Sequence, residues 1–171
     1  YLFCFLTTIT SAQVLFEDYF IDHTLRFDFV FTGNSNSISA YPMEIKKESF
    51  YGGSTVNLID KFNYGNIRFE VSDVSTGKLI YSKGYGTLFQ EWQTTPEASN
   101  ISRSFYEVIK FPFPKNDVTL TIKKFEKDGS CGTIYQTTID PGNYFIIDEQ
   151  PGNTKTSRIA GEGDPHKSVD I

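Results

Sequence analysis

Residues His23 to Phe31 read H-T-L-R-F-D-F-V-F, and this stretch decides the class of fold. Large apolar residues occupy every second position: Leu25, Phe27, Phe29 and Phe31 fall on one side, and Arg26, Asp28 and Val30 on the other. Because side chains alternate between the two faces of a strand, this period of two predicts a strand with one buried face. We therefore expect Phe27 and Phe29 to point inward, and Asp28 to lie on the opposite face, where its loss would cost far less stability than the loss of Phe27.

Two hairpins are expected further along the chain. Asn66–Asp73 alternates in the same way, and Leu79–Tyr85 follows it after a turn in which Gly77 suits the left-handed position of a short loop. The segments Asp117–Phe125 and Thr133–Ile139 form a second pair, because an Asp-Gly turn lies between them.

The remaining segments carry weaker patterns. Arg103–Phe111 is expected to form a strand that Pro112 and Pro114 end. Phe16–Asp22 fits either a short strand or a turn of helix. The other expected elements are a long connection with an edge strand at Ile38–Tyr51, a short strand at Asn57–Phe62 and a helical turn starting at Thr95-Pro96. Many short strands between turns predict an all-β fold, a β-sandwich of antiparallel strands with at most one short helix.

The composition is that of one globular domain. The chain has 171 residues, of which 39% are hydrophobic and 16% aromatic, which excludes a disordered tail and a bundle of membrane helices. The net charge of −5 and the scattered basic residues argue against a nucleic-acid partner. We expect no nucleic acid and no membrane span.

The two ends of the chain differ from its middle. Residues 1–12 are apolar and uncharged up to Thr10-Ser11-Ala12, so we interpret them as the remnant of a signal peptide cleaved between Ala12 and Gln13. The alternative is a buried first strand. The signal interpretation implies export: a secreted, periplasmic or cell-surface protein. Residues 13–148 would form the sandwich. Residues 149–171 are rich in Gly, Pro, Thr and Ser up to Pro165, which indicates a linker that enters a new strand at Val169–Ile171.

No recognisable catalytic or metal-binding motif occurs in the sequence. Only His23 and His166 are histidines, and H-E-x-x-H, G-x-S-x-G and the P-loop pattern are absent. His23 is better explained as a solvated loop histidine than as a ligand. Cys131 is the one cysteine after the presumed signal, so no internal disulfide is expected. We therefore assign no catalytic and no metal-binding residue.

The stretch Leu88–Ala98 carries the only tryptophan. Phe89 and Trp92 either anchor this loop in the core, which we favour, or remain exposed and contact a partner domain or a sugar. They are the candidate interdomain or loop-anchor residues.

Several blocks, in order, carry a resemblance to a known family: Phe16–Phe31 with Gly33-Asn34, Thr76-Gly77-Lys78, Leu88–Ala98, Phe111–Lys115 and Gly163–Ile171. They resemble the N-terminal domain of the secreted bacterial metallopeptidases of the IgA peptidase family, family 64 of the metallopeptidases. The resemblance implies that 149–171 leads into a truncated catalytic domain. That domain would hold the zinc and the catalytic glutamate, so no cofactor is expected in this chain.

Three functions compete. The first is a non-catalytic accessory domain, whose partners are its own C-terminal catalytic domain and a protein substrate. The second is a free-standing cell-surface module that binds glycan or protein through aromatic residues such as Tyr85, Trp92 and Tyr106. The third, an enzyme with a site spread over loops, is the weakest because no nucleophile–base or metal constellation is present.

Overall fold

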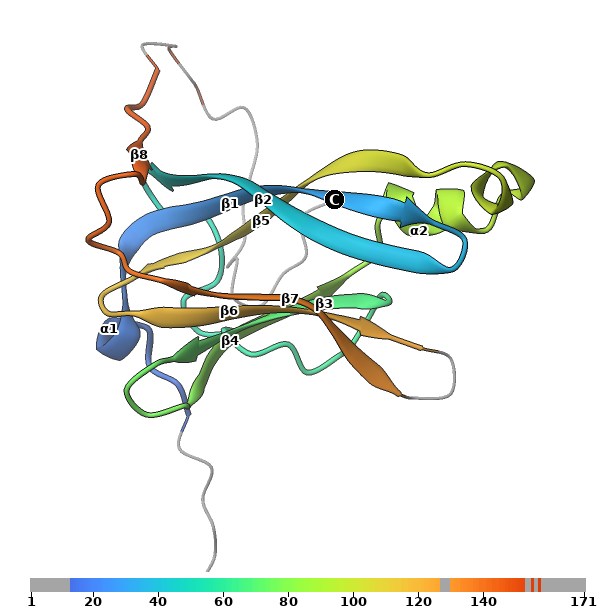
Figure 1. Ribbon diagram of the computed structural model, residues 1–171. Coiled ribbons are helices and arrows are strands. Elements are labelled where there is room, and N and C mark those ends of the chain that lie inside the picture. Colours follow the sequence, from blue (N-terminus) through green and yellow to red (C-terminus); the bar gives the residue numbers. More distant parts are fainter. Residues whose placement is uncertain (1–12, 127–129, 153–154, 156, 158–171) are drawn as a thin grey trace, which may run out of the picture.

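The structure, a computed structural model that describes residues 13–126, 130–152, 155 and 157, consists of two stacked four-stranded sheets (Figure 1). The first sheet has the order β5-β1-β2-β8, with β5 at Arg103–Pro114, β1 at Phe20–Asn34, β2 at Ser37–Glu48 and β8 at Ile147–Asp148. The second has the order β4-β3-β6-β7, with β4 at Leu79–Tyr85, β3 at Ile67–Asp73, β6 at Val118–Phe125 and β7 at Cys131–Ile139. All pairs are antiparallel except the short β2–β8 pair, so the predicted all-β sandwich is confirmed.

The inner face of β1 supplies much of the core. Phe27, Phe29 and Phe31 are buried, as the alternating pattern predicts. The Phe27 ring lies 6.0 Å from Tyr135 of β7, measured between ring centroids, and this contact joins the two sheets. Burying a phenylalanine side chain contributes roughly 1.5–3 kcal/mol, so this row of rings is a main source of stability.

Asp28 lies on the opposite face of β1, but it is completely buried there. Arg26 Nε donates a hydrogen bond of 2.7 Å to its carboxylate, and the Tyr106 hydroxyl donates a second one from β5. Burial alone would raise the pKa of Asp28, but these hydrogen bonds outweigh it and hold the pKa below its usual range. Neighbouring side chains cover this carboxylate. The alternation of apolar and polar residues in the sequence does not reveal such contacts.

Proline does not end β5 at Phe111, contrary to the expectation. The strand continues to Pro114, and Pro112 pairs with Thr24 next to an irregularity in the register. Because β5 is an edge strand, the missing N–H of a proline costs no hydrogen bond within the sheet. Pro42 lies in β2 beside the register shift at Asp28/Phe29, and such an irregularity is the other place in a sheet where proline is found.

Three short helical segments accompany the strands. The expected turn is a 3₁₀-helix, η1, at Pro96–Ser99, and the structure adds α1 at Phe16–Tyr19 and α2 at Leu88–Gln93. The sequence of Phe16–Asp22 fits either a short strand or a turn of helix, and the structure has α1 followed by the start of β1 there. In the described part of the chain, no helix has the length and apolar character needed to cross a membrane.

Both predicted hairpins are present, as β3–β4 and β6–β7, and Gly77 has the expected positive φ of 68°. The expected strand at Asn57–Phe62 is wrong, because only a single bridge between Ile59 and Ser82 forms there. The Asp-Gly turn at 127–129, Ala12 and the strand expected at Val169–Ile171 lie outside the described residues.

Phe27→Ala should lower the free energy of unfolding by about 3–5 kcal/mol, because it leaves a cavity between the sheets. Asp28→Ala should cost about 1–3 kcal/mol, because Arg26 and Tyr106 lose their shared partner. Urea denaturation measures both. Tyr41→Ala, at a side chain of the first sheet that is 55% exposed, is the control and should have little effect. If Asp28→Ala were as mild as Tyr41→Ala, the role given to the buried carboxylate would be wrong.

Candidate functional site

The connection Ser49–Asn66, which we call the strap, crosses from the end of β2 in the first sheet to the start of β3 in the second (Figure 1). Connections longer than about 12–15 residues without secondary structure are uncommon in compact domains and are usually functional. The length of the strap therefore indicates that it forms part of a functional site.

Hydrogen bonds fix the first part of the strap to β1. Thr24 Oγ1 donates to the carbonyl of Phe50 over 2.7 Å, and the backbone N–H of Tyr51 donates to Asp22 Oδ1 over 3.1 Å. His23 lies in β1 and not in a loop, and its Nδ1 is 3.1 Å from the carbonyl oxygen of Glu48. These contacts hold the backbone where it leaves the first sheet.

The middle of the strap runs along the free edge of β4. The N–H of Ser82 donates to the carbonyl of Leu58 over 3.0 Å, and the N–H of Asp60 donates back to the carbonyl of Ser82 over 3.2 Å. The Leu58 side chain is buried. Covering an edge strand in this way prevents it from pairing with another chain.

The Asp60 carboxylate ties the strap to itself and to β4. Its Oδ1 accepts from the N–H of Phe62 over 2.8 Å, and its Oδ2 accepts from the N–H of Gly84 over 2.9 Å. Burial raises the pKa of Asp60, but the backbone hydrogen bonds have the larger effect and the pKa lies below its usual range. At Gly84 a Cβ atom would collide with the carbonyl oxygen of Tyr64, so glycine permits this close crossing.

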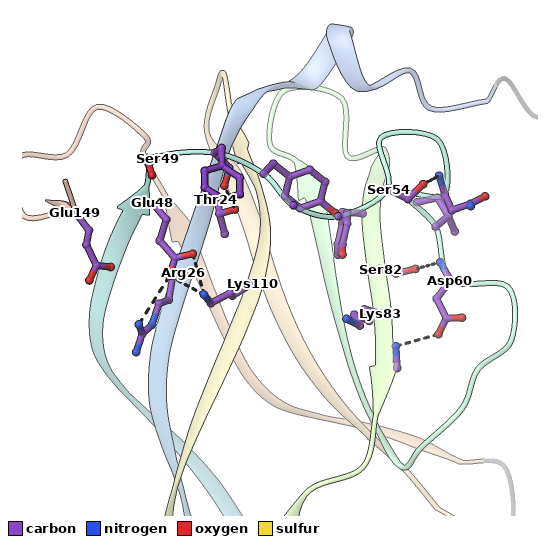
Figure 2. A pocket seen from close by; sticks show the side chains of 18 of the residues that line it. Thr24, Arg26, Glu48, Ser49, Ser54, Asp60, Ser82, Lys83, Lys110 and Glu149 are labelled. Carbon is purple, nitrogen blue, oxygen red and sulfur yellow. Dashed lines mark hydrogen bonds and ion pairs between the residues drawn. The ribbon is translucent and has the colours of Figure 1, made fainter. Parts of the chain in front are cut away.

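A pocket of about 1190 Å³ lies beside the strap (Figure 2). Arg26, Glu48 and Lys110 line it from the first sheet. Asp60 of the strap and Lys83 of β4 line it from the other side, as Figure 2 shows. The pocket is thus lined by residues of both sheets and bounded by the strap.

The charges of the pocket are only partly neutralised. Both Glu48 oxygens accept from Lys110 Nζ, at 2.7 and 2.8 Å, and Arg26 Nη1 is 3.8 Å from the same carboxylate. Lys61 and Lys83 also line the pocket, and neither forms an ion pair with any residue that the structure describes. The pocket therefore presents the charges of two lysines, and the exposed Glu149 carboxylate beside them, to a partner.

Three large aromatic side chains at the pocket are strongly exposed. Phe50, Phe62 and Tyr64 expose 67%, 74% and 73% of their surface, and the last two rings are stacked with centroids 5.6 Å apart. We call these three residues the aromatic rim. Scattered exposed hydrophobic residues are normal, but a cluster beside a pocket marks an interaction site.

The phenol groups of Tyr51 and Tyr81 are hydrogen-bonded to each other in the pocket wall. Burial raises the pKa of both, so both stay protonated at neutral pH. Among the residues described, no three His, Cys, Asp or Glu side chains lie close enough together to hold a metal ion. The site can offer hydrogen bonds, charge and stacking surface, which is the chemistry of binding.

The candidate residues named in the sequence analysis do not line this pocket. Phe89 and Trp92 are in α2, where Phe89 is fully buried and Trp92 is 9% exposed. Trp92 packs 5.6 Å from the Phe105 ring, and its Nε1 donates to Glu97 over 2.8 Å. Gln13 is the first described residue and is exposed.

The aromatic residues suggested for a glycan module do not form one surface. Tyr85 packs against Phe69 at 6.2 Å, and Tyr106 binds Asp28 on the outer face of the first sheet. Neither these two nor Trp92 line the pocket. The sequence did contain a signal for the actual rim: aromatic and glycine residues concentrated in a long segment between two strands.

Fold and site define a small β-sandwich domain with a binding pocket. A family model described as the Peptidase M64 N-terminus matches residues 15–136, and the chain belongs to this family. No curated protein matches the chain.

Asp60→Ala should release the strap, because three backbone N–H groups lose their acceptor. We expect trypsin to cleave after Lys61 about tenfold faster, which corresponds to roughly 1.4 kcal/mol of lost local stability. Because the pKa of Asp60 is lowered, its stabilisation is present above the unfolded pKa of about 3.9 and is lost as the pH falls through the folded value.

The stability difference between the wild type and Asp60→Ala in urea should therefore shrink below about pH 4. Asp140→Ala is the control, because that exposed carboxylate accepts a hydrogen bond from the N–H of Gly142, away from the strap. Equal cleavage rates in wild type, Asp60→Ala and Asp140→Ala would contradict the anchoring role.

Trp92 should fluoresce with a blue-shifted maximum and be poorly quenched by acrylamide, because its ring packs between Phe89 and Phe105. Trp92→Ala should cost about 3–5 kcal/mol of unfolding free energy. Trp92→Phe, which keeps a ring but loses the bond to Glu97, should cost less. A readily quenched Trp92 whose removal leaves the melt unchanged would exclude the anchor role.

Proposed function

We propose that this chain is the non-catalytic N-terminal accessory domain of an exported zinc metallopeptidase. Its role is to position the catalytic domain or a protein substrate. The observation that carries the proposal is the match of residues 15–136 to the N-terminal domain of peptidase M64. The zinc ligands and the catalytic glutamate would lie in a domain after Ile171.

The geometry of the pocket supports a role in binding. The strap is fixed to both sheets by hydrogen bonds at Thr24 and Asp60, so its exposed side chains are presented on a rigid backbone. A rigid surface loses little conformational entropy when it binds a partner. The domain can therefore hold another protein surface in a defined orientation.

Export and the substrate class belong to the same proposal. The apolar residues 1–12, with a small residue at Ala12 before Gln13, favour a signal peptide and a secreted, periplasmic or cell-surface location. The resemblance to the bacterial IgA peptidases favours a protein substrate.

The alternative is a free-standing cell-surface module that binds glycan or protein. The exposed aromatic rim favours it, because Phe50, Phe62 and Tyr64 could stack on sugar rings. The two functions differ in whether the domain changes the activity of a peptidase in the same polypeptide.

The test compares the complete gene product with a variant that lacks residues 13–148, on a folded protein substrate and on a short peptide. We expect the deletion to lower kcat/KM on the protein substrate by at least about tenfold, roughly 1.4 kcal/mol of transition-state stabilisation. A smaller effect on the short peptide would assign the domain to substrate positioning. An equal effect on both would assign it to positioning of the catalytic domain.

The chain by itself is the control and should cleave neither substrate. Unchanged kcat/KM on both substrates after the deletion would contradict the accessory function and leave the binding module as the better account.

A further inference from the structure

The last continuous stretch of described residues, 130–152, ends at the strap pocket. After β8 pairs with β2, the N–H of Glu149 donates to the carbonyl of Lys47 over 2.9 Å. The next residues, Glu149–Gly152, line the same pocket as the strap. Whatever follows these residues in the polypeptide starts next to the pocket, and this proximity gives it a high effective concentration there.

The aromatic rim is suited to contact with another folded surface. Phe50, Phe62 and Tyr64 project from a backbone that Thr24 and Asp60 hold in place. Aromatic side chains are enriched in the buried centres of protein interfaces, where few rotamers have to be fixed. An interface here needs little reorganisation of the strap.

The charged residues beside the aromatic rim indicate what kind of protein surface would fit against it. Lys61 and Lys83 lie beside the aromatic rings and have no ion pair within the described part of the chain. A partner with an apolar centre and carboxylates around it would neutralise both lysines, and such complementarity fixes orientation.

A sugar fits the same groups less well. Two of the three carboxylates that line the pocket are already occupied, Asp60 by backbone N–H groups and Glu48 by Lys110, which leaves Glu149 as the acceptor for sugar hydroxyls. The Phe62 and Tyr64 rings also stack on each other with an interplanar angle of 11°, so one flat face of each is covered.

We infer that the aromatic rim, with Lys61 and Lys83, is the contact face for the catalytic domain that follows in the same polypeptide. This inference rests on the proposed accessory function and names the surface through which it acts. Glu149–Gly152 line the pocket, and the following domain covers the exposed rings.

Hydroxyl-radical footprinting tests this without any mutation. The chain alone and the complete gene product are labelled, and the oxidation of each aromatic residue is measured by mass spectrometry. We expect several-fold slower oxidation of Phe50, Phe62 and Tyr64 in the complete product. Tyr41, which is 55% exposed on the first sheet and does not line the pocket, is the matched control and should react equally in both.

Equal oxidation of the rim in both samples would overturn the inference while leaving the accessory function intact, because the deletion experiment tests that function separately. Protection of the chain alone that grows with its concentration would assign the rim to a second copy. Protection of the chain alone by added N-acetylglucosamine oligomers would assign it to a glycan. Either result would also overturn the inference.

A double substitution tests whether the exposed rings hold the following domain. Phe62→Ala with Tyr64→Ala removes two exposed rings, so the melting temperature of the chain alone should hardly change. In the complete product the same change should increase trypsin cleavage between residues 153 and 171 several-fold, whereas Tyr41→Ala should not. No change in cleavage would count against the contact face.

Discussion

The row of phenylalanine rings on the inner face of β1 is the contact on which both the sheets and the site depend. β1 is flanked by β5 and β2 in its own sheet, and Phe27 reaches Tyr135 in the other. Phe31 contacts Phe89 at 5.9 Å, which fixes α2 against the same core. Because the N-terminal part of β1 also carries Thr24, the strand that organises the core also positions the strap.

The strap adds a pocket with exposed aromatic side chains to this core. A long connection normally has high conformational freedom, and fixing each backbone residue costs about 1–2 kcal/mol. Hydrogen bonds at Ser82 and Asp60 and the burial of Leu58 offset this cost where the strap passes β4. The aromatic rim and Lys61 are among the exposed residues of the strap, and Lys83 of β4 lines the same pocket.

Patterns among neighbouring residues in the sequence predicted the strands and turns that depend mainly on those residues. The alternation around Phe27 predicted the buried strand, and Gly77 predicted the turn of the first hairpin. The burial of Asp28 depends on Arg26 and Tyr106, and the continuation of β5 through Pro112 depends on its place at the sheet edge. The pocket could not be predicted, because it joins residues of β1, β2, β4 and the strap that are far apart in sequence.

Chemical cross-linking of the complete gene product is the most direct measurement of the central claim, that the strap pocket faces the domain that follows. With a lysine-reactive reagent, Lys61 and Lys83 should cross-link to lysines after Ile171. Lys123, which is bound to Glu70 on the outer face of the second sheet, should not. Cross-links from Lys123 without any from Lys61 or Lys83 would contradict the claim, because the following domain would then lie against a different face.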